Sequence, residues 1–207
     1  MMDENKLDEL IESCSYIDVN LKERCKKYFK QVNRELDDWF YSKNSSEDLY
    51  QGDIINNLEM AFLEVSNNII EYKLIENQQC ILLSNTCDMS PENKTREKFV
   101  SVAPVFSYSD FSQNKIERYD VNAWNNFLQD VKRNNITDIL YIPQNRNFES
   151  SVVLLDRIFS IDINSFYFIF NTRCKNKILS LSQLGHYIFL IKLTNHFARY
   201  EDKSEIR

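Results

Sequence analysis

The chain has 207 residues, of which 43% are hydrophobic and 13% aromatic, and it carries a formal net charge of −6. That composition supplies a real apolar core and excludes an intrinsically disordered chain, and the acidic balance excludes a protein that coats nucleic acid through a generally basic surface. The chain has two glycines, Gly52 and Gly185, so no glycine-rich phosphate loop of the Rossmann or P-loop kind can be written.

The sequence shows no targeting or membrane-spanning segment. Its first ten residues, MMDENKLDEL, are acidic and contain no apolar signal region, and no apolar run reaches the length of a membrane span. The five cysteines are odd in number and scattered, which favours reduced thiols over a disulfide framework. We therefore expect a cytoplasmic protein with no membrane partner.

Residues 3–42 are predicted to form two helices, because apolar residues recur there at helical spacing. Asp18 or Asn20 can cap the second helix. The polar segment SKNSSED follows and marks the best internal boundary. We therefore predict an N-terminal helical extension over residues 1–48 and a main domain over residues 49–207.

Strand-like segments dominate the first part of the main domain. Each is apolar, mostly rich in isoleucine and valine, and bounded by polar residues. The segments cover residues 51–55, 80–88, 98–106, 138–143 and 151–162. Between the first two, residues 58–65 and 68–75 predict a hairpin that turns around Ser66, Asn67 and Asn68.

Helices are predicted within and after these strands. An inserted helix is expected in residues 107–136, with Asn122 as its cap. The clearest helix covers residues 180–200, where Ser180 and Gln183 make a capping box. Order and content together predict an α+β fold: a small closed β-barrel with N-terminal helices, an inserted helix and a C-terminal helix.

Four short motifs follow one another in a recognisable order. They are Gly52-Asp53-Ile54, the ILLSN segment, Val102-Ala103-Pro104-Val105 and the SVVLLDRIFSID segment, and a helix follows the last of them. In this order they resemble the MazF/PemK family of toxins from bacterial toxin–antitoxin systems. The resemblance covers roughly residues 50–199, with an insertion around residues 107–136.

The resemblance implies a compact Src-homology-3-like barrel, commonly a homodimer, in a family that cleaves single-stranded RNA without a metal or other cofactor. Two places depart from the family pattern. The family carries Arg and Pro where this chain has ENQQC at residues 76–80, and Thr or Ser where this chain has Phe106, with Ser107 one place later. A one-residue slip in a strand turns a side chain to the opposite face. These departures leave two main functions open, beside a third that depends on Cys87.

The first hypothesis is an RNA-directed toxin or defence protein that acts as an endoribonuclease and is held by an antitoxin. Its candidate catalytic residues are Asp53, Asp88, Arg157 and Ser107. Carboxylates can move protons, and an arginine in a late strand can reach a phosphate. The structural alternatives are an Asp53 that bonds the backbone beside a turn glycine and an Arg157 that forms a salt bridge on a strand face.

The richest polar cluster is Ser84, Asn85, Thr86, Cys87 and Asp88. It ends a predicted buried strand, where polar groups can converge on RNA or on a partner. The cluster also allows another function, that of a hydrolase in which the Cys87 thiolate is the nucleophile. The structural alternative is an Asx-rich strand exit with Cys87 as a small buried hydrophobe.

The next loop carries three basic residues, Lys94, Arg96 and Lys98. They can form the positive lip of a groove that binds nucleic acid, or they can simply be solvated.

The second hypothesis is a catalytically inactive barrel that binds a protein partner. The apolar stripe with Trp39 and Phe40 offers it a docking or dimer surface. The two histidines lie ten residues apart on the last predicted helix, and no CxxC or HxxxH motif occurs, so no metal site is predicted.

Overall fold

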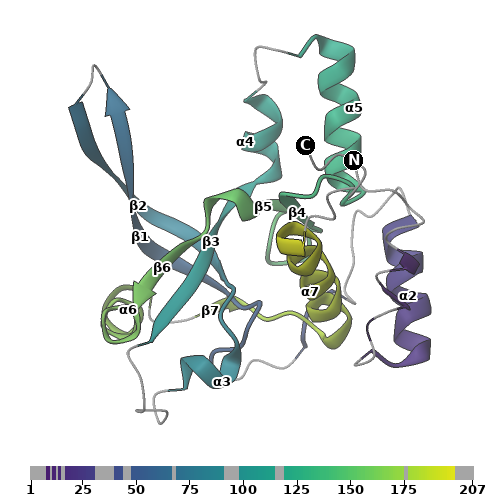
Figure 1. The fold of residues 1–207 in the computed structure, drawn as a ribbon, viewed down its shortest axis with the longest axis horizontal. Helices are drawn as coiled ribbons and strands as arrows, with labels where there is room; N and C mark the ends of the chain where they lie inside the picture. The colour runs from purple at the N-terminus through teal and green to yellow at the C-terminus, as the bar shows by residue number, and fades with distance from the viewer. Residues whose placement is uncertain are drawn as a thin grey trace, which may run out of the picture. The chain divides into compact units, whose positions relative to one another are not determined.

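The structure is a computed structural model, and it describes residues 8–9, 11–12, 14, 17–30, 40–43, 48–66, 69–90, 98–114, 119–174 and 177–198. These residues have an α+β fold (Figure 1). The chain divides into two compact units. Unit 1 contains Met1–Tyr41, Phe106–Asp156 and Leu181–Arg207. Unit 2 contains Ser42–Val105 and Arg157–Ser180.

Unit 2 is built on an antiparallel sheet with the strand order β6-β3-β2-β1-β7. Its strands are β1 (Ile54–Ser66), β2 (Ile69–Leu82), β3 (Phe99–Ser107, of which the last two residues belong to unit 1), β6 (Phe159–Asp162) and β7 (Lys177–Leu179). The predicted hairpin is confirmed, because β1 and β2 pair antiparallel along almost their whole length. Both strands alternate apolar and polar residues near the turn, which is the period of an extended chain.

The predicted closure of this sheet into a barrel is wrong for the strands that the structure describes. Within unit 2, β6 and β7 are the outermost strands, and no pairing joins them among the described residues. β7 pairs only with Ile54 and Ile55 of β1, and β6 pairs only with the first four residues of β3. β7 has three residues and β6 has four, so each offers little backbone for pairing, and β1 and β2 leave the sheet as a ribbon.

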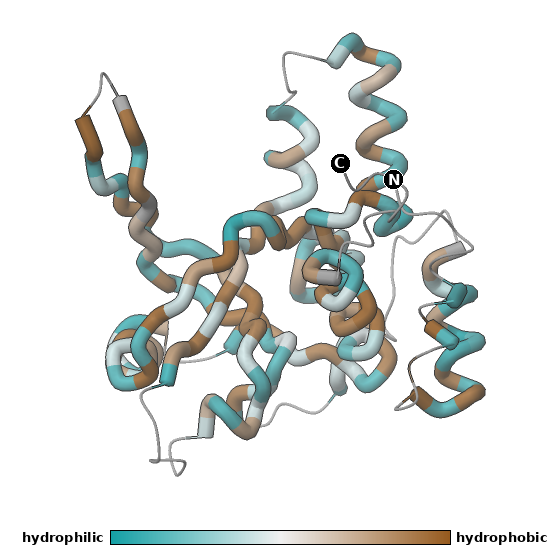
Figure 2. Tube along the Cα trace, in the orientation of Figure 1, coloured by the Kyte–Doolittle hydropathy of each residue, from teal (hydrophilic) through white to brown (hydrophobic). Residues whose placement is uncertain are grey.

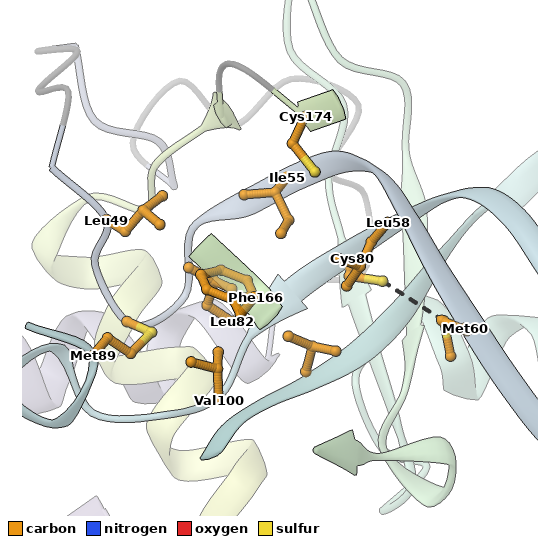
Figure 3. Close-up of a cluster of buried hydrophobic side chains, with 11 residues drawn as sticks. Leu49, Ile55, Leu58, Met60, Cys80, Leu82, Met89, Val100, Phe166 and Cys174 are labelled. Carbon is orange, nitrogen blue, oxygen red and sulfur yellow. Dashed lines mark hydrogen bonds between the residues drawn. The ribbon is translucent and has the colours of Figure 1, made fainter. Parts of the chain in front are cut away.

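One side of the unit 2 sheet carries the core of the unit, which Figure 3 shows. α6 (Ile163–Ile169) and the π-helical turn η2 (Phe170–Cys174) supply part of it, and α3 (Thr86–Met89) adds Met89. The buried members are Leu49, Ile55, Leu58, Met60, Cys80, Leu82, Met89, Val100, Val102, Phe166 and Cys174. Burial raises the pKa of the Cys80 and Cys174 thiols, so both stay protonated and act as apolar groups.

Unit 1 combines helices with a short β-hairpin. Its elements are α2 (Val19–Lys30), α4 (Tyr108–Gln113), α5 (Val121–Lys132), β4 (Ile139–Ile142), β5 (Ser151–Leu154) and α7 (Gln183–Ala198). All four residues of β4 and of β5 are buried. Trp124 Nε1 donates a hydrogen bond to the Ser112 carbonyl oxygen at 3.0 Å, which ties α5 to α4. None of the helices in the described residues is both long and apolar enough to cross a membrane.

The helix caps agree with the sequence in one case and differ in two. Asp18 caps α2, because its Oδ1 accepts the Asn20 amide at 2.8 Å. Asp120, not the predicted Asn122, caps α5 by accepting the Ala123 amide at 2.7 Å. Ser182, not the predicted Ser180, accepts an amide in the first turn of α7, that of Gly185 at 3.1 Å. In both corrections a cap lies two residues from the predicted one, within the usual uncertainty of helix ends.

Three predicted elements are divided or shortened. The inserted helix is two helices, α4 and α5. The strand predicted over 80–88 ends at Leu82, and α3 follows. The segment over 151–162 forms β5 and β6, separated by the 3-10 turn η1 (Leu155–Arg157). A continuous apolar run does not reveal such a break, because it lacks the apolar–polar repeat by which a strand is told from a helix or a turn.

Candidate functional site

The predicted polar cluster lies at one end of the unit 2 sheet, where β2 ends and β1 begins. Gly52 has φ 90°, a conformation that favours glycine, and its amide donates to the Leu82 carbonyl oxygen at 2.8 Å. The Leu82 amide donates to the Asp53 carbonyl oxygen at 2.9 Å. These bonds hold the turn before β1 against the end of β2. We call residues 48–53 and 82–88 the corner.

Asp53 is the buried carboxylate of the corner, with 1% of its surface exposed. Its Oδ2 accepts the Tyr50 amide at 2.8 Å and lies 3.0 Å from Lys177 Nζ. Lys177 Nζ also donates to the Asp48 carbonyl oxygen at 2.5 Å and lies 5.0 Å from the centre of the Tyr50 ring. The carboxylate therefore braces a turn and compensates a buried ammonium group, which is the structural role that the sequence left open.

Residues 84–88 form an Asx turn that leads into α3. Asn85 Oδ1 accepts the Cys87 amide at 3.0 Å and caps the helix. Thr86 Oγ1 accepts the Gln51 amide at 3.0 Å, which ties the helix to the turn before β1. Cys87 and Asp88 are exposed, so Cys87 is not the small buried hydrophobe of the structural alternative. Asp88 presents a carboxylate to solvent at the corner.

A row of serines begins at the corner and crosses the sheet. Ser84 Oγ accepts the Ser101 amide at 2.8 Å, and Ser101 Oγ lies 2.9 Å from Ser160 Oγ. Ser84 and Ser101 are half-buried, and Ser160 is exposed. Hydroxyl groups in such a row are able to contact phosphate oxygens. Sequence reasoning selected Ser84 but missed the other two, whose signal is a serine inside an otherwise apolar strand.

Two of the predicted catalytic residues fall in different units. Arg157 belongs to unit 2, is exposed, and lies in the 3-10 turn η1 instead of the predicted strand. Ser107 belongs to unit 1, where its Oγ caps α4 by accepting the Asp110 amide at 3.4 Å and donates to Glu149 Oε2 at 3.2 Å.

The predicted basic loop is described at one residue. Lys94 and Arg96 lie outside the described residues. Lys98 is half-buried at the start of β3, and its carbonyl oxygen accepts the Ile163 amide at 2.9 Å. The positive lip therefore stays a prediction.

β1 and β2 continue beyond the core of unit 2 as a two-stranded ribbon that projects from the rest of the sheet (Figure 1). The pairing register shifts twice at the base of this ribbon. Asn57 and Asn77 lie at these shifts with φ values of 59° and 58°. Bulges of this kind increase the twist and re-aim both strands. We call residues 60–66 and 69–75 the arm.

One face of the arm is apolar along its whole length. It consists of three cross-strand pairs, Ala61–Leu74, Leu63–Tyr72 and Val65–Ile70. All six side chains are exposed, and the exposed fraction of the five larger ones runs from 55% at Leu74 to 82% at Tyr72. Hydrophobic residues are accordingly prominent on both strands of the arm in Figure 2. We call these six residues the apolar face.

The opposite face of the arm points toward the core at its base and carries charged residues farther out, with Ile69 exposed at its end. Met60 pairs with Ile75 there, and both pack in the core of unit 2. Beyond them Glu64 lies opposite Glu71, and Lys73 Nζ is 3.6 Å from Glu64 Oε2. Side chains of successive residues alternate across a strand. The apolar face is therefore turned away from the side on which the arm meets the core of its unit, so that core does not cover it.

The sequence predicts the hairpin that forms the arm, but the exposed apolar face of the arm was missed. The alternation of Leu63, Glu64 and Val65 is the pattern that could have indicated one apolar face and one face with charged residues. The stripe with Trp39 and Phe40, which the sequence predicts as a partner surface, is not one at Phe40. Phe40 is 0% exposed, and its ring centre lies 5.7 Å from that of Tyr28. Trp39 lies outside the described residues.

No protein-family model matches the chain, and no curated protein matches it. The resemblance to the MazF/PemK family thus depends on the four motifs. Within the described residues, no group of three or more His, Cys, Asp or Glu side chains is arranged to hold a metal ion.

Proposed function

We propose that this protein is a binding module that engages a protein partner through the apolar face of the arm. The observation that carries the proposal is the exposure of six apolar side chains on one side of a ribbon. Contiguous apolar patches on protein surfaces mark interaction sites. A two-stranded ribbon is marginally stable by itself in water, so a partner that buries this face also stabilises the arm.

The charges of the arm favour a protein partner over nucleic acid. Nucleic-acid binding needs cationic groups that neutralise phosphates. The arm carries Glu64 and Glu71, and its lysine, Lys73, lies beside Glu64. The whole chain is acidic as well, with a formal net charge of −6. An apolar face beside acidic residues suits a protein surface.

Affinity capture from native lysate tests this function. Tyr72→Lys places a charge in the middle of the apolar face, and Glu71→Lys places the same residue on the charged face as a matched control. We expect wild type and the Glu71→Lys variant to retain the same protein, identified by mass spectrometry, and the Tyr72→Lys variant to lose it. Equal retention by all three forms would contradict the proposal.

The second candidate function is that of a divergent MazF/PemK-like toxin or defence protein that cleaves RNA. It is supported by the order of the four motifs, by the serine row and by the exposed carboxylate of Asp88, which belongs to the corner where that row begins. In this function the serine hydroxyls bind the RNA backbone, and Asp88 accepts the proton of the 2′-hydroxyl that attacks the phosphate. The bond from phosphorus to the 5′-oxygen breaks, and water gives that departing oxygen a proton.

RNA cleavage by purified protein tests the second candidate. The reaction is run with and without EDTA, beside the Asp88→Ala variant. Site-specific cutting that EDTA spares and Asp88→Ala abolishes is the expected result for a metal-independent endoribonuclease. Intact RNA after incubation with folded wild-type protein would remove this candidate and leave the binding module.

A further inference from the structure

We infer that the partner of the apolar face is a second copy of this chain, so that two arms pack face to face in a symmetric dimer. The inference rests on the proposed binding function and adds the identity of the partner. It follows from the pattern of side chains on the face, from the area that the face offers and from the position of the charges.

The apolar face is complementary to itself about a two-fold axis. When two arms lie antiparallel and face to face, the central pair Leu63–Tyr72 of one lies over the same pair of the other. Ala61 at one end then lies over Val65 at the other end, so a small side chain meets a β-branched one. Leu74 lies over Ile70 in the same way. Such a contact is isologous, since each residue meets its counterpart reciprocally, and it closes as a dimer.

The area of the face is sufficient for such a dimer. Five large apolar side chains on each arm are 55% to 82% exposed. Each offers on the order of 100 Å² of apolar surface to a partner. Two arms together would bury roughly 1,000 Å², about the lower limit for a specific protein–protein interface. The two ribbons then form a small two-layer sandwich with an apolar interior, which is the usual way in which antiparallel strands bury one face.

The charged residues of the arm remain in water in this arrangement. Glu64, Glu71 and Lys73 lie on the outer faces of the paired ribbons, because they alternate with the buried residues. A lipid surface is a poorer occupant, since the carboxylates of the arm and the net charge of −6 are repelled by anionic membranes. Two acidic copies also repel one another, so added salt should strengthen the dimer by screening that repulsion.

Sedimentation equilibrium of the full chain tests the inference, over about 1 to 100 μM, the range in which an interface of this size associates measurably. The measurement compares wild type with Tyr72→Lys on the apolar face and Glu71→Lys on the charged face. We expect a reversible monomer–dimer equilibrium for wild type and for Glu71→Lys. We expect Tyr72→Lys to raise the dissociation constant by about tenfold or more, because it removes a central aromatic contact and buries a charge.

Hydrogen–deuterium exchange provides a second measurement that keeps a misfolded variant from being mistaken for a dissociated one. Wild-type amides in residues 60–75 should become more protected as concentration rises, and those of Tyr72→Lys should not, with protection elsewhere unchanged. A wild type that stays monomeric across the range would overturn the inference, as would a dimer that Tyr72→Lys leaves intact.

The outcomes also distinguish a failure of the dimer inference from a failure of the proposed binding function. A monomeric wild type whose captured protein is lost with Tyr72→Lys overturns the second copy and keeps the binding module. A monomer that floats with lipid vesicles, and ceases to with Tyr72→Lys, overturns both in favour of a membrane. A dimer that Tyr72→Lys dissociates, with arm amides protected, supports both.

Discussion

Lys192 Nζ lies 2.9 Å from the carbonyl oxygen of Asn134 inside unit 1, and neither residue is exposed. The same nitrogen donates to the Ile136 carbonyl oxygen at 2.5 Å. Asn134 in turn forms two side-chain hydrogen bonds with the backbone of Tyr141, at 2.7 Å to its amide and 3.2 Å to its carbonyl oxygen. Lys192 thus connects α7 to the loop between α5 and β4, and its burial makes the stability of the protein depend on pH.

The first prediction concerns that pH dependence. Burial lowers the pKa of Lys192 to about 7 from its ordinary value of 10.5, although nearby Asp138 opposes the change. Between these two values the unfolded chain holds the proton and the folded chain does not, so the unfolded state binds more protons. Stability therefore rises with pH across this window, by at most about 1.4 kcal/mol per unit, and levels off below it.

Urea unfolding of wild type and of Lys192→Met at intervals from pH 7 to 9 measures this slope. The variant has no amine to titrate, so we expect the difference in unfolding free energy to grow in favour of wild type as pH rises. The difference removes the contribution of all other titrating groups. Parallel curves for the two proteins would show that Lys192 keeps its ordinary pKa in the folded chain.

The second prediction concerns Gly185, where α7 passes close to the backbone of Phe40. A Cβ atom at Gly185 would lie 2.2 Å from the Phe40 carbonyl oxygen. This oxygen belongs to the backbone, so it cannot move aside to relieve the clash as the end of a flexible side chain could. The same oxygen accepts the Ser182 amide at 2.9 Å. We expect Gly185→Ala to lower the unfolding free energy by about 1–3 kcal/mol. Gln183→Ala, at an exposed position of the same helix, should change it by less than about 0.5 kcal/mol.

Local patterns account for the parts of the fold that could be predicted. The ribbon of β1 and β2 follows from two-residue alternation, β3 and β4 from short apolar runs, and α7 from a long helical stripe. The closure of the barrel could not be judged in this way, because it depends on whether two distant edge strands meet. The residue before each break, as at Leu82 and Leu154, looks like any other apolar strand residue.

The candidate sites show the same limit. Asp53 was recognised from its place after Gly52, but its ion-pair partner Lys177 lies 124 residues away, and no local pattern joins them. The arm was recognised as a hairpin, but which of its faces meets the core depends on the bulges at Asn57 and Asn77. A bulge adds one residue and so exchanges the two faces of the strand beyond it.

The third prediction concerns the thiols. Cys87 is exposed, and the other four cysteines are buried. Burial raises the pKa of Cys25 to about 11, and it raises that of Cys80 and Cys174 as well. Since the thiolate is the reactive form, we expect iodoacetamide to label one site per folded chain at neutral pH. Intact-mass analysis measures the count, and Cys87→Ser should leave the folded chain unlabelled. Labelling at several sites would mean that unit 1 or unit 2 opens readily.

The fourth prediction decides whether Asp53 supports the fold or serves a reaction. Asp53→Asn keeps an acceptor for the Tyr50 amide but removes the carboxylate that pairs with Lys177, whose side chain is 9% exposed. Removing one partner of a buried ion pair costs about 3–5 kcal/mol, because the remaining charge stays desolvated. We expect the unfolding free energy measured in urea to fall by that amount, with dimer formation through the arm unchanged in the fraction that is folded.

Asp88→Asn is the matched control, since Asp88 is an exposed carboxylate of the same corner. It should change the unfolding free energy by less than about 0.5 kcal/mol. A stable Asp53→Asn protein would refute the bracing role and return Asp53 to the list of residues to test for RNA cleavage.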